Sequence, residues 1–108
     1  MISRDIRLVI FLLVFVSGCS SDPKKQSNSY TVEIKQMKFV PGELVLERGD
    51  TVVFVNHDLL RHDITELSGK AWSSSSLSPN SSWTMVVEKS SDYYCSFHPV
   101  MKGRLVVK

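Results

Sequence analysis

The stretch that decides how this chain folds is Cys95-Ser96-Phe97-His98-Pro99-Val100-Met101. It places a thiol, an imidazole and a thioether within seven residues. Thiolate and thioether sulfur favour Cu(I), and imidazole binds either oxidation state of copper. Two histidines, one cysteine and a distant methionine form the site of electron-transfer copper proteins. One more histidine is needed, and only His57 and His62 remain. We favour His62, and the segment predicts a copper site.

The N-terminus resembles a bacterial lipoprotein signal peptide. Arg4 and Arg7 precede an apolar run over residues 8–16, and small residues stand just before Cys19. This run is far shorter than the roughly 20 residues that span a bilayer, so it is typical of a cleaved signal. We expect residues 1–18 to be removed and Cys19 to carry a lipid. The domain would then be exported and anchored to a membrane, facing the periplasm or the cell exterior. An uncleaved hydrophobic N-terminus would also place it outside the cytoplasm.

Lipidation of Cys19 would leave Cys95 without a disulfide partner. An unpaired cysteine in an exported protein indicates an intermolecular bridge, a reactive thiol or a metal ligand. A small buried hydrophobe is the structural alternative. His98 and Met101, three and six residues further on, favour the metal ligand.

Composition divides the mature chain into a tether and one small domain. Residues 19–29 are polar and lack apolar periodicity, so they predict a flexible tether before a domain at residues 30–108. The mature chain would carry 11 Lys and Arg residues against 10 Asp and Glu, a balance that argues against nucleic acid as a partner. No nucleophile motif, carboxylate pair or phosphate-binding loop is present, so we expect a non-enzyme, and a monomer.

The domain has the pattern of an all-β protein. Segments rich in Val, Ile, Thr and aromatic residues alternate with Gly, Pro, Asn and Ser, without a helical period. The nearly continuous apolar segment 51–55 predicts a strand covered on both faces. Cys95 should point inward, at the end of a strand. This pattern predicts a Greek-key β-sandwich of two sheets. We expect irregular structure over residues 68–82 and strands at residues 30–35, 37–39, 43–47, 51–55, 62–66, 83–87, 93–97 and 103–108.

Three linked segments resemble the cupredoxins over nearly the whole mature domain. They are residues 39–52, the pair Val55-Asn56 followed by His62-Asp63, and residues 94–101 followed by Gly103. The spacing Cys-x2-His-x2-Met is similar to that of amicyanins, whereas plastocyanins and pseudoazurins have longer His-to-Met spacings. The resemblance implies one type 1 copper bound by His62, Cys95 and His98, with Met101 as the weak axial ligand.

The resemblance also implies residues that support the ligands. Asp63 should bond to Ser96, and a backbone N–H should point at the thiolate and tune its electron donation. Asn56 belongs to the same supporting set. His57 would be an exposed loop residue. Arg61 stands where many relatives have proline just before the first histidine ligand.

The implied function is that of a small blue-copper protein that carries single electrons in the cell envelope. A c-type cytochrome, an amine dehydrogenase or a terminal reductase would be its redox partner. His98 would be the electron port, inside an apolar docking patch formed by Leu59, Leu60, Pro99 and Val100. These four residues could instead fill the interior of their loops.

Other functions and other roles for aromatic residues stay open at this point. A copper-trafficking lipoprotein that delivers copper to an apo-enzyme is the main alternative, and zinc binding is the weaker one, because structural zinc sites use four ligands. Tyr94, next to Cys95, offers a second electron route or simple packing. We assign Trp72 and Trp83 to packing.

Overall fold

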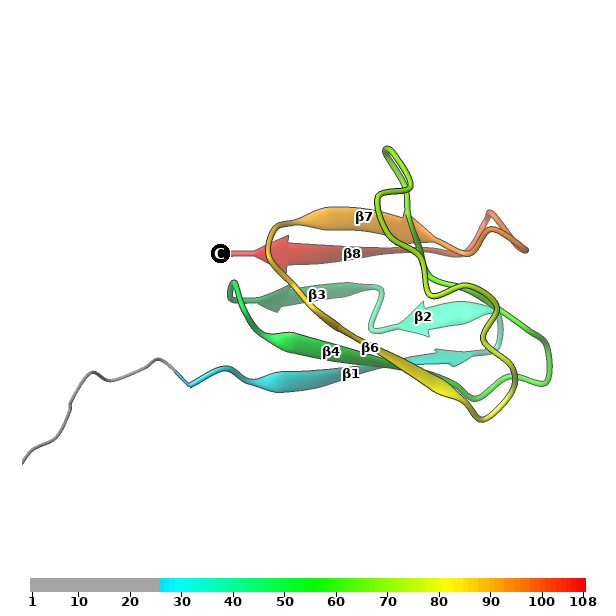
Figure 1. Ribbon diagram of the computed structural model, residues 1–108. Coiled ribbons are helices and arrows are strands. Elements are labelled where there is room, and N and C mark those ends of the chain that lie inside the picture. Colours follow the sequence, from blue (N-terminus) through cyan, green and yellow to red (C-terminus); the bar gives the residue numbers. More distant parts are fainter. Residues whose placement is uncertain (1–25) are drawn as a thin grey trace, which may run out of the picture.

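The computed structural model describes residues 26–108 as two β-sheets packed face to face (Figure 1). The predicted signal peptide, Cys19 and residues 20–25 of the predicted tether lie outside the described residues. Residues 26–108 contain no helix, and therefore none long and apolar enough to cross a membrane. The all-β sandwich prediction is confirmed.

Eight strands account for the regular structure of residues 26–108. The short alternating segments of the sequence form strands because one face of each can be buried while the other stays in solvent. The strands are β1 (Ser29–Lys35), β2 (Lys38–Val40), β3 (Glu43–Leu46), β4 (Thr51–Asn56), β5 (Thr65–Glu66), β6 (Ser82–Val86), β7 (Ser91–Tyr94) and β8 (Lys102–Val107).

Each sheet has four strands and mixes parallel with antiparallel pairs. The first sheet has the order β2-β1-β4-β6, with β1 parallel to β4, and the second has the order β3-β8-β7-β5, with β3 parallel to β8. The remaining pairs are antiparallel. Consecutive strands often lie in different sheets, so the chain crosses repeatedly between the layers and ties them together.

The core lies between the two sheets and ends at the cysteine. Phe54 from the first sheet and Tyr93 from the second meet edge to face, with ring centroids 5.4 Å apart. Cys95 is fully buried at one end of this core, as predicted from the period of two. The other fully buried apolar side chains among residues 26–108 are Val32, Ile34, Leu46, Val52, Ile64, Val87 and Leu105.

Three details of the strand prediction are wrong. Strand β4 is buried on one face and only half-buried on the other, rather than covered on both. The predicted strand 62–66 is reduced to Thr65–Glu66, because His62 bonds instead to the loop residue Leu77. The predicted strand 93–97 ends at Tyr94, because from Cys95 onward the backbone bonds within its own loop.

The loops that carry the predicted ligands gather at one end of the sandwich. In Figure 1 they lie at the right, together with the turn between β1 and β2, whereas the C-terminus and the start of β1 lie at the opposite end. The sandwich therefore carries the predicted metal ligands on one set of loops at one end.

Candidate metal centre

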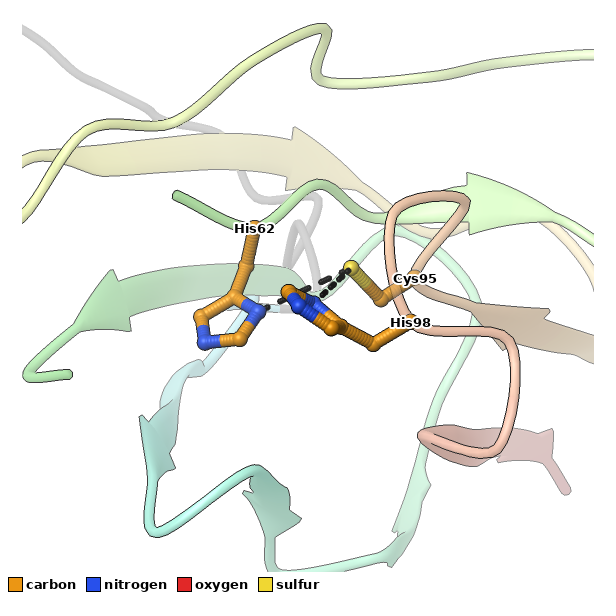
Figure 2. A group of neighbouring side chains, drawn as sticks. All are labelled: His62, Cys95 and His98. Carbon is orange, nitrogen blue, oxygen red and sulfur yellow. Dashed lines mark hydrogen bonds between the residues drawn. The ribbon is translucent and has the colours of Figure 1, made fainter. Parts of the chain in front are cut away.

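His62, Cys95 and His98 converge on one point at this end of the molecule. Figure 2 shows both imidazole rings with their Nδ1 atoms turned toward the cysteine sulfur. The Sγ to Nδ1 distance is 3.7 Å for His62 and 3.8 Å for His98. His62 and Cys95 are fully buried and His98 is half-buried. Two loops distant in sequence thus bring one sulfur and two nitrogen donors within 4.8 Å of one another.

The spacing of these three atoms fits a single metal ion. Metal–sulfur and metal–nitrogen bonds of about 2.3 and 2.0 Å at a trigonal angle would separate sulfur and nitrogen by about 3.7 Å. The observed separations of 3.7 and 3.8 Å match this value. The donor set of one thiolate and two imidazoles is the one that proteins use for blue copper.

Backbone and amide hydrogen bonds hold His62 in position. Its N–H and C=O bond to Leu77, at 3.2 and 2.8 Å. Asn56, fully buried at the end of β4, donates its side-chain amide to the carbonyls of Leu60 and Leu77, at 2.9 and 3.0 Å. Its Oδ1 accepts the backbone N–H of Asp58 at 2.9 Å. Asn56 therefore braces both chain segments that flank His62, as expected of a residue that supports a ligand.

Asp58 is a supporting residue that the sequence did not reveal. Its Oδ2 lies 2.8 Å from Nε2 of His62, and its side chain is only 14% exposed. A carboxylate can only accept a hydrogen bond, so the His62 ring must carry its proton on Nε2. This leaves the lone pair of Nδ1 directed toward Cys95. Asp58 thus selects the tautomer that can bind a metal beside the sulfur of Cys95.

The same carboxylate supports the turn between β1 and β2. Gln36 and Met37 both have left-handed backbone angles, with φ of 53° and 60°, a conformation of two-residue hairpins that usually requires glycine or asparagine. Their backbone N–H groups donate to the two oxygens of Asp58 at 2.7 and 3.0 Å. Burial opposes ionisation of Asp58, but the hydrogen bonds from Met37, His62 and Gln36 lower its pKa. One charged group therefore joins a strained turn to a ligand.

The loop that carries Cys95 and His98 is closed by its own backbone. Cys95 N–H donates to the Met101 carbonyl at 3.1 Å, His98 N–H to the Cys95 carbonyl at 3.1 Å, and Met101 N–H to the His98 carbonyl at 2.9 Å. Met101 is buried at the base of this loop. The short spacing of the motif thus folds into a compact loop that returns directly into β8.

The predicted link between the two ligand loops is present. Asp63 Oδ1 accepts the backbone N–H of Ser96 at 2.6 Å, and Oδ2 accepts the Ser96 hydroxyl. In return, the backbone N–H of Asp63 points at the sulfur of Cys95, at 3.4 Å. The predicted bond to Ser96 and the predicted N–H on the thiolate are confirmed. Together they fix the His62 segment against the Cys95 segment.

Both ligand loops expose apolar side chains. Leu59 is 93% exposed, Leu60 52% and Val100 86%, and Pro99 is also exposed. These residues therefore do not fill loop interiors. Phe97, which the sequence did not single out, adds a half-exposed ring from the Cys95–Met101 loop. We call the exposed side chains of Leu59, Leu60, Phe97, Pro99 and Val100 the apolar patch.

The other residues considered from the sequence have simple surroundings. His57 is exposed and Tyr94 is half-buried on β7. Trp72 and Trp83 lie against each other, with ring centroids 6.0 Å apart, and pack on the edge of the core. Arg61 is exposed, and its guanidinium donates to the hydroxyl of Ser76 at 3.0 Å. The packing role predicted for the tryptophans is confirmed.

Comparison with known proteins places the fold and the site in one class. The sequence model of the family described as "Cupredoxin-like domain" matches residues 8–107. The chain belongs to this cupredoxin-like family, whose site chemistry of two histidines and a cysteine is that of type 1 copper.

Amicyanins are among its relatives in sequence. The chain is 32% identical to amicyanin-alpha of Methylorubrum extorquens over 88 residues, which cover 76% of this chain and 74% of that protein. It is 30% identical to the amicyanin of Paracoccus denitrificans over 71% of this chain and 63% of that protein. The amicyanin of Paracoccus versutus is 25% identical, over 76% of this chain and 67% of that protein. The chain thus spans about two thirds of the length of the two Paracoccus amicyanins.

Solved structures agree with this placement. A Cu(I) form of an amicyanin variant superposes with a TM-score of 0.69 and 26% identity, over 74% of this chain and 82% of that one. The purple cupredoxin of Nitrosopumilus maritimus superposes with a TM-score of 0.66 and 25% identity, over 72% of this chain and 98% of that one. The backbone arrangement seen here is therefore shared with solved copper proteins.

Proposed function

We propose that this protein is a one-electron carrier that binds a single copper ion through His62, Cys95 and His98, with Met101 as the weak axial ligand. The observation that carries the proposal is the convergence of both Nδ1 atoms on the buried sulfur at 3.7 and 3.8 Å. Bound copper would supply a reversible change between Cu(II) and Cu(I). The membership of the cupredoxin-like family supports the same ligands.

The contribution of the protein chain is to keep the donor atoms in place. Asn56 and Asp58 hold the His62 segment, and Asp63 ties this segment to the Cys95 loop. Ligands locked by hydrogen bonds on a rigid scaffold move little when the charge of the site changes. Little reorganisation then opposes electron transfer, which suits a carrier better than a catalyst.

Electrons would enter and leave through His98. It is the only donor of the three that is not buried, and Phe97, Pro99 and Val100 of the apolar patch lie in the same loop. A small apolar surface suits a weak and short-lived encounter between redox proteins. A c-type cytochrome, an amine dehydrogenase or a terminal reductase would be such a partner. Tyr94 offers a second route by its position next to Cys95.

The burial of His62 and Cys95 speaks against the copper-trafficking alternative, because a carrier that hands over its metal needs ligands that a recipient can reach. Zinc would fit the three donors, but structural zinc sites use four. We therefore rank electron transfer first.

The cellular placement of the carrier follows from the N-terminal pattern. We propose that the signal at residues 1–18 is removed, that Cys19 is lipidated, and that the domain at residues 30–108 works as a monomer beside a membrane outside the cytoplasm. Fractionation of cells that express the chain tests this placement. The unaltered chain should carry a lipid and be found in the membrane fraction, whereas the Cys19→Ala variant should carry none and be found in the soluble fraction. An equal distribution of the two proteins, with no lipid on Cys19, would contradict the anchor.

Voltammetry of the copper-loaded protein tests the function. A carrier should give a reversible one-electron wave that persists over repeated cycles, and Cys95→Ala should abolish it. A wave that decays over the cycles because the reduced protein releases its copper would favour trafficking over electron transfer.

A further inference from the structure

The exposed charge of this protein differs from its formal charge. Residues 26–108 contain nine Lys and Arg residues and nine Asp and Glu residues. All nine basic side chains are exposed. Asp50, Asp63 and Glu66 are buried, and Asp58 is only 14% exposed. Carboxylates have thus been withdrawn from the surface, while cations have not.

The burial of carboxylates matters most at the end of the sandwich that carries the ligand loops, which we call the metal end. The only carboxylates of the two ligand loops, over residues 57–64 and 96–101, are Asp58 and Asp63. Asp58 is occupied by Gln36, Met37 and His62, and Asp63 by Ser96. The metal end therefore offers no exposed carboxylate from these loops to a partner.

Two cations border the apolar patch. Arg61 follows Leu60 directly and is held outside by Ser76 at 3.0 Å. Lys102 directly follows the loop that carries Cys95 and His98, and its ammonium group donates back to the Pro99 carbonyl of this loop at 2.9 Å. Within residues 26–108 neither of them makes an ion pair. By contrast, Arg48 and Arg104, outside these loops, pair with Glu88 and Asp92 at 3.2 and 2.8 Å.

We infer that the redox partner of this protein carries an acidic surface around its own exposed redox centre, complementary to Arg61 and Lys102. This inference rests on the proposed function and extends it to the chemistry of the partner. The apolar patch excludes water at the contact, and the two cations align and attract the partner. Charges on the rim of an interface act mainly on the association rate and make it depend on salt. The balanced total charge conceals this local positive surface.

Small redox probes of opposite charge test the surface without knowledge of the partner. The reduced, copper-loaded protein gives one electron to hexacyanoferrate(III), which becomes hexacyanoferrate(II), or to tris(phenanthroline)cobalt(III), which becomes the cobalt(II) complex. Stopped-flow absorption measures both rates over a range of ionic strength. With the anionic probe the rate should fall as salt is added, and with the cationic probe it should rise.

Charge-matched variants locate the effect. Arg61→Gln with Lys102→Gln should slow the anionic probe at low salt by on the order of fourfold for each cation removed. This is the effect of one charge about 10 Å from a trivalent ion in water. Lys89→Gln with Lys108→Gln makes the same change in total charge at the opposite end, where the β6–β7 connection and the C-terminus lie (Figure 1). This control pair should keep both rates and their salt dependence.

The outcomes separate the inference from the proposed function. If salt changes the rates of both probes in the same way, the inference of an acidic partner is overturned. The same holds if the control pair loses as much of the salt dependence as the Arg61 and Lys102 pair does. In both cases the proposed electron transfer is unaffected. Failure to exchange an electron with either probe would refute the proposed function itself. If Cys19→Ala protein binds phosphatidylglycerol vesicles only when Arg61 and Lys102 are intact, the surface faces an anionic membrane and the inference is overturned.

Discussion

Removal of the Asp58 carboxylate should both lower the free energy of unfolding and disturb the metal site. Its two oxygens accept three hydrogen bonds, from Gln36 at 2.7 Å, Met37 at 3.0 Å and the His62 ring at 2.8 Å. Hydrogen bonds to a charged group contribute about 1.5–3 kcal/mol each. The two turn amides are near solvent and can bond to water in the variant, so their loss costs less. We expect Asp58→Ala to lower the free energy of unfolding by about 2–4 kcal/mol.

Urea unfolding of the metal-free protein measures this loss. Asp58→Asn keeps one acceptor oxygen and should lose about half as much. Asp92→Ala is the matched control, because the carboxylate that it removes forms, within residues 26–108, only an exposed ion pair with Arg104, worth about 0–1 kcal/mol. The copper-loaded Asp58→Ala protein should also show a shifted visible spectrum, because the His62 ring is free to rotate. If Asp58→Ala is no more destabilising than Asp92→Ala and leaves the spectrum unchanged, the role given to Asp58 is refuted.

Three further predictions concern the supporting residues and the core. Asp63→Asn should raise the reduction potential by about 50–100 mV, because a carboxylate near the site favours Cu(II), and an unchanged potential in voltammetry would contradict this. Hydrogen bonds from the Ser68 hydroxyl and from backbone N–H groups lower the pKa of Glu66 from 4.5 to about 2. The ionised Glu66 carboxylate should therefore contribute its full stabilisation above pH 4.5, and this contribution should be lost as the pH falls toward 2. The urea midpoints of wild type and Glu66→Gln should therefore converge in acid, and a constant difference between them would argue against the assignment. A methyl group added at Gly103 would lie 2.5 Å from Cε2 of Tyr93 and still closer to its Cζ and its hydroxyl oxygen. Gly103→Ala should consequently cost about 2–3 kcal/mol or more, whereas Tyr93→Phe, which removes a buried hydroxyl without a hydrogen-bond partner among the described residues, should stabilise the protein by about 1 kcal/mol. Equal unfolding midpoints for Gly103→Ala and wild type would contradict the close contact.

Two of the three converging donors were predictable because they stand close together in the sequence. Cys95 and His98 lie within one short loop, and the alternation of the strand before them indicates that the cysteine points inward. The contact between Asp63 and Ser96 was accessible only through the family resemblance. The two residues are 33 positions apart, and nothing in their own segments pairs them.

Asp58 could not be found in this way. Its role depends on the β1–β2 turn, which lies 21 and 22 residues earlier in the chain and adopts left-handed angles without glycine or asparagine. A pattern search for turns therefore passes over Gln36 and Met37. The strand limits at His62 and Cys95 failed for a related reason, because ligand loops replace ladder hydrogen bonds with bonds of their own.

The difference in exposure between the acidic and the basic side chains near the ligands was also hidden in the sequence. Counting Lys, Arg, Asp and Glu gives a near balance, because a count treats buried and exposed groups alike. Only the fold shows that Asp58 and Asp63 point inward, while Arg61 and Lys102 remain at the surface.

The most direct test of the central claim is the visible absorption and electron paramagnetic resonance of the purified protein loaded with Cu(II), measured beside a Cys95→Ala control. A thiolate held with two imidazoles should give an intense visible charge-transfer band and narrow copper hyperfine splitting, and both should be absent from the control. A colourless protein that retains only Cu(I) or zinc would contradict the type 1 copper centre and, with it, the proposed role in electron transfer.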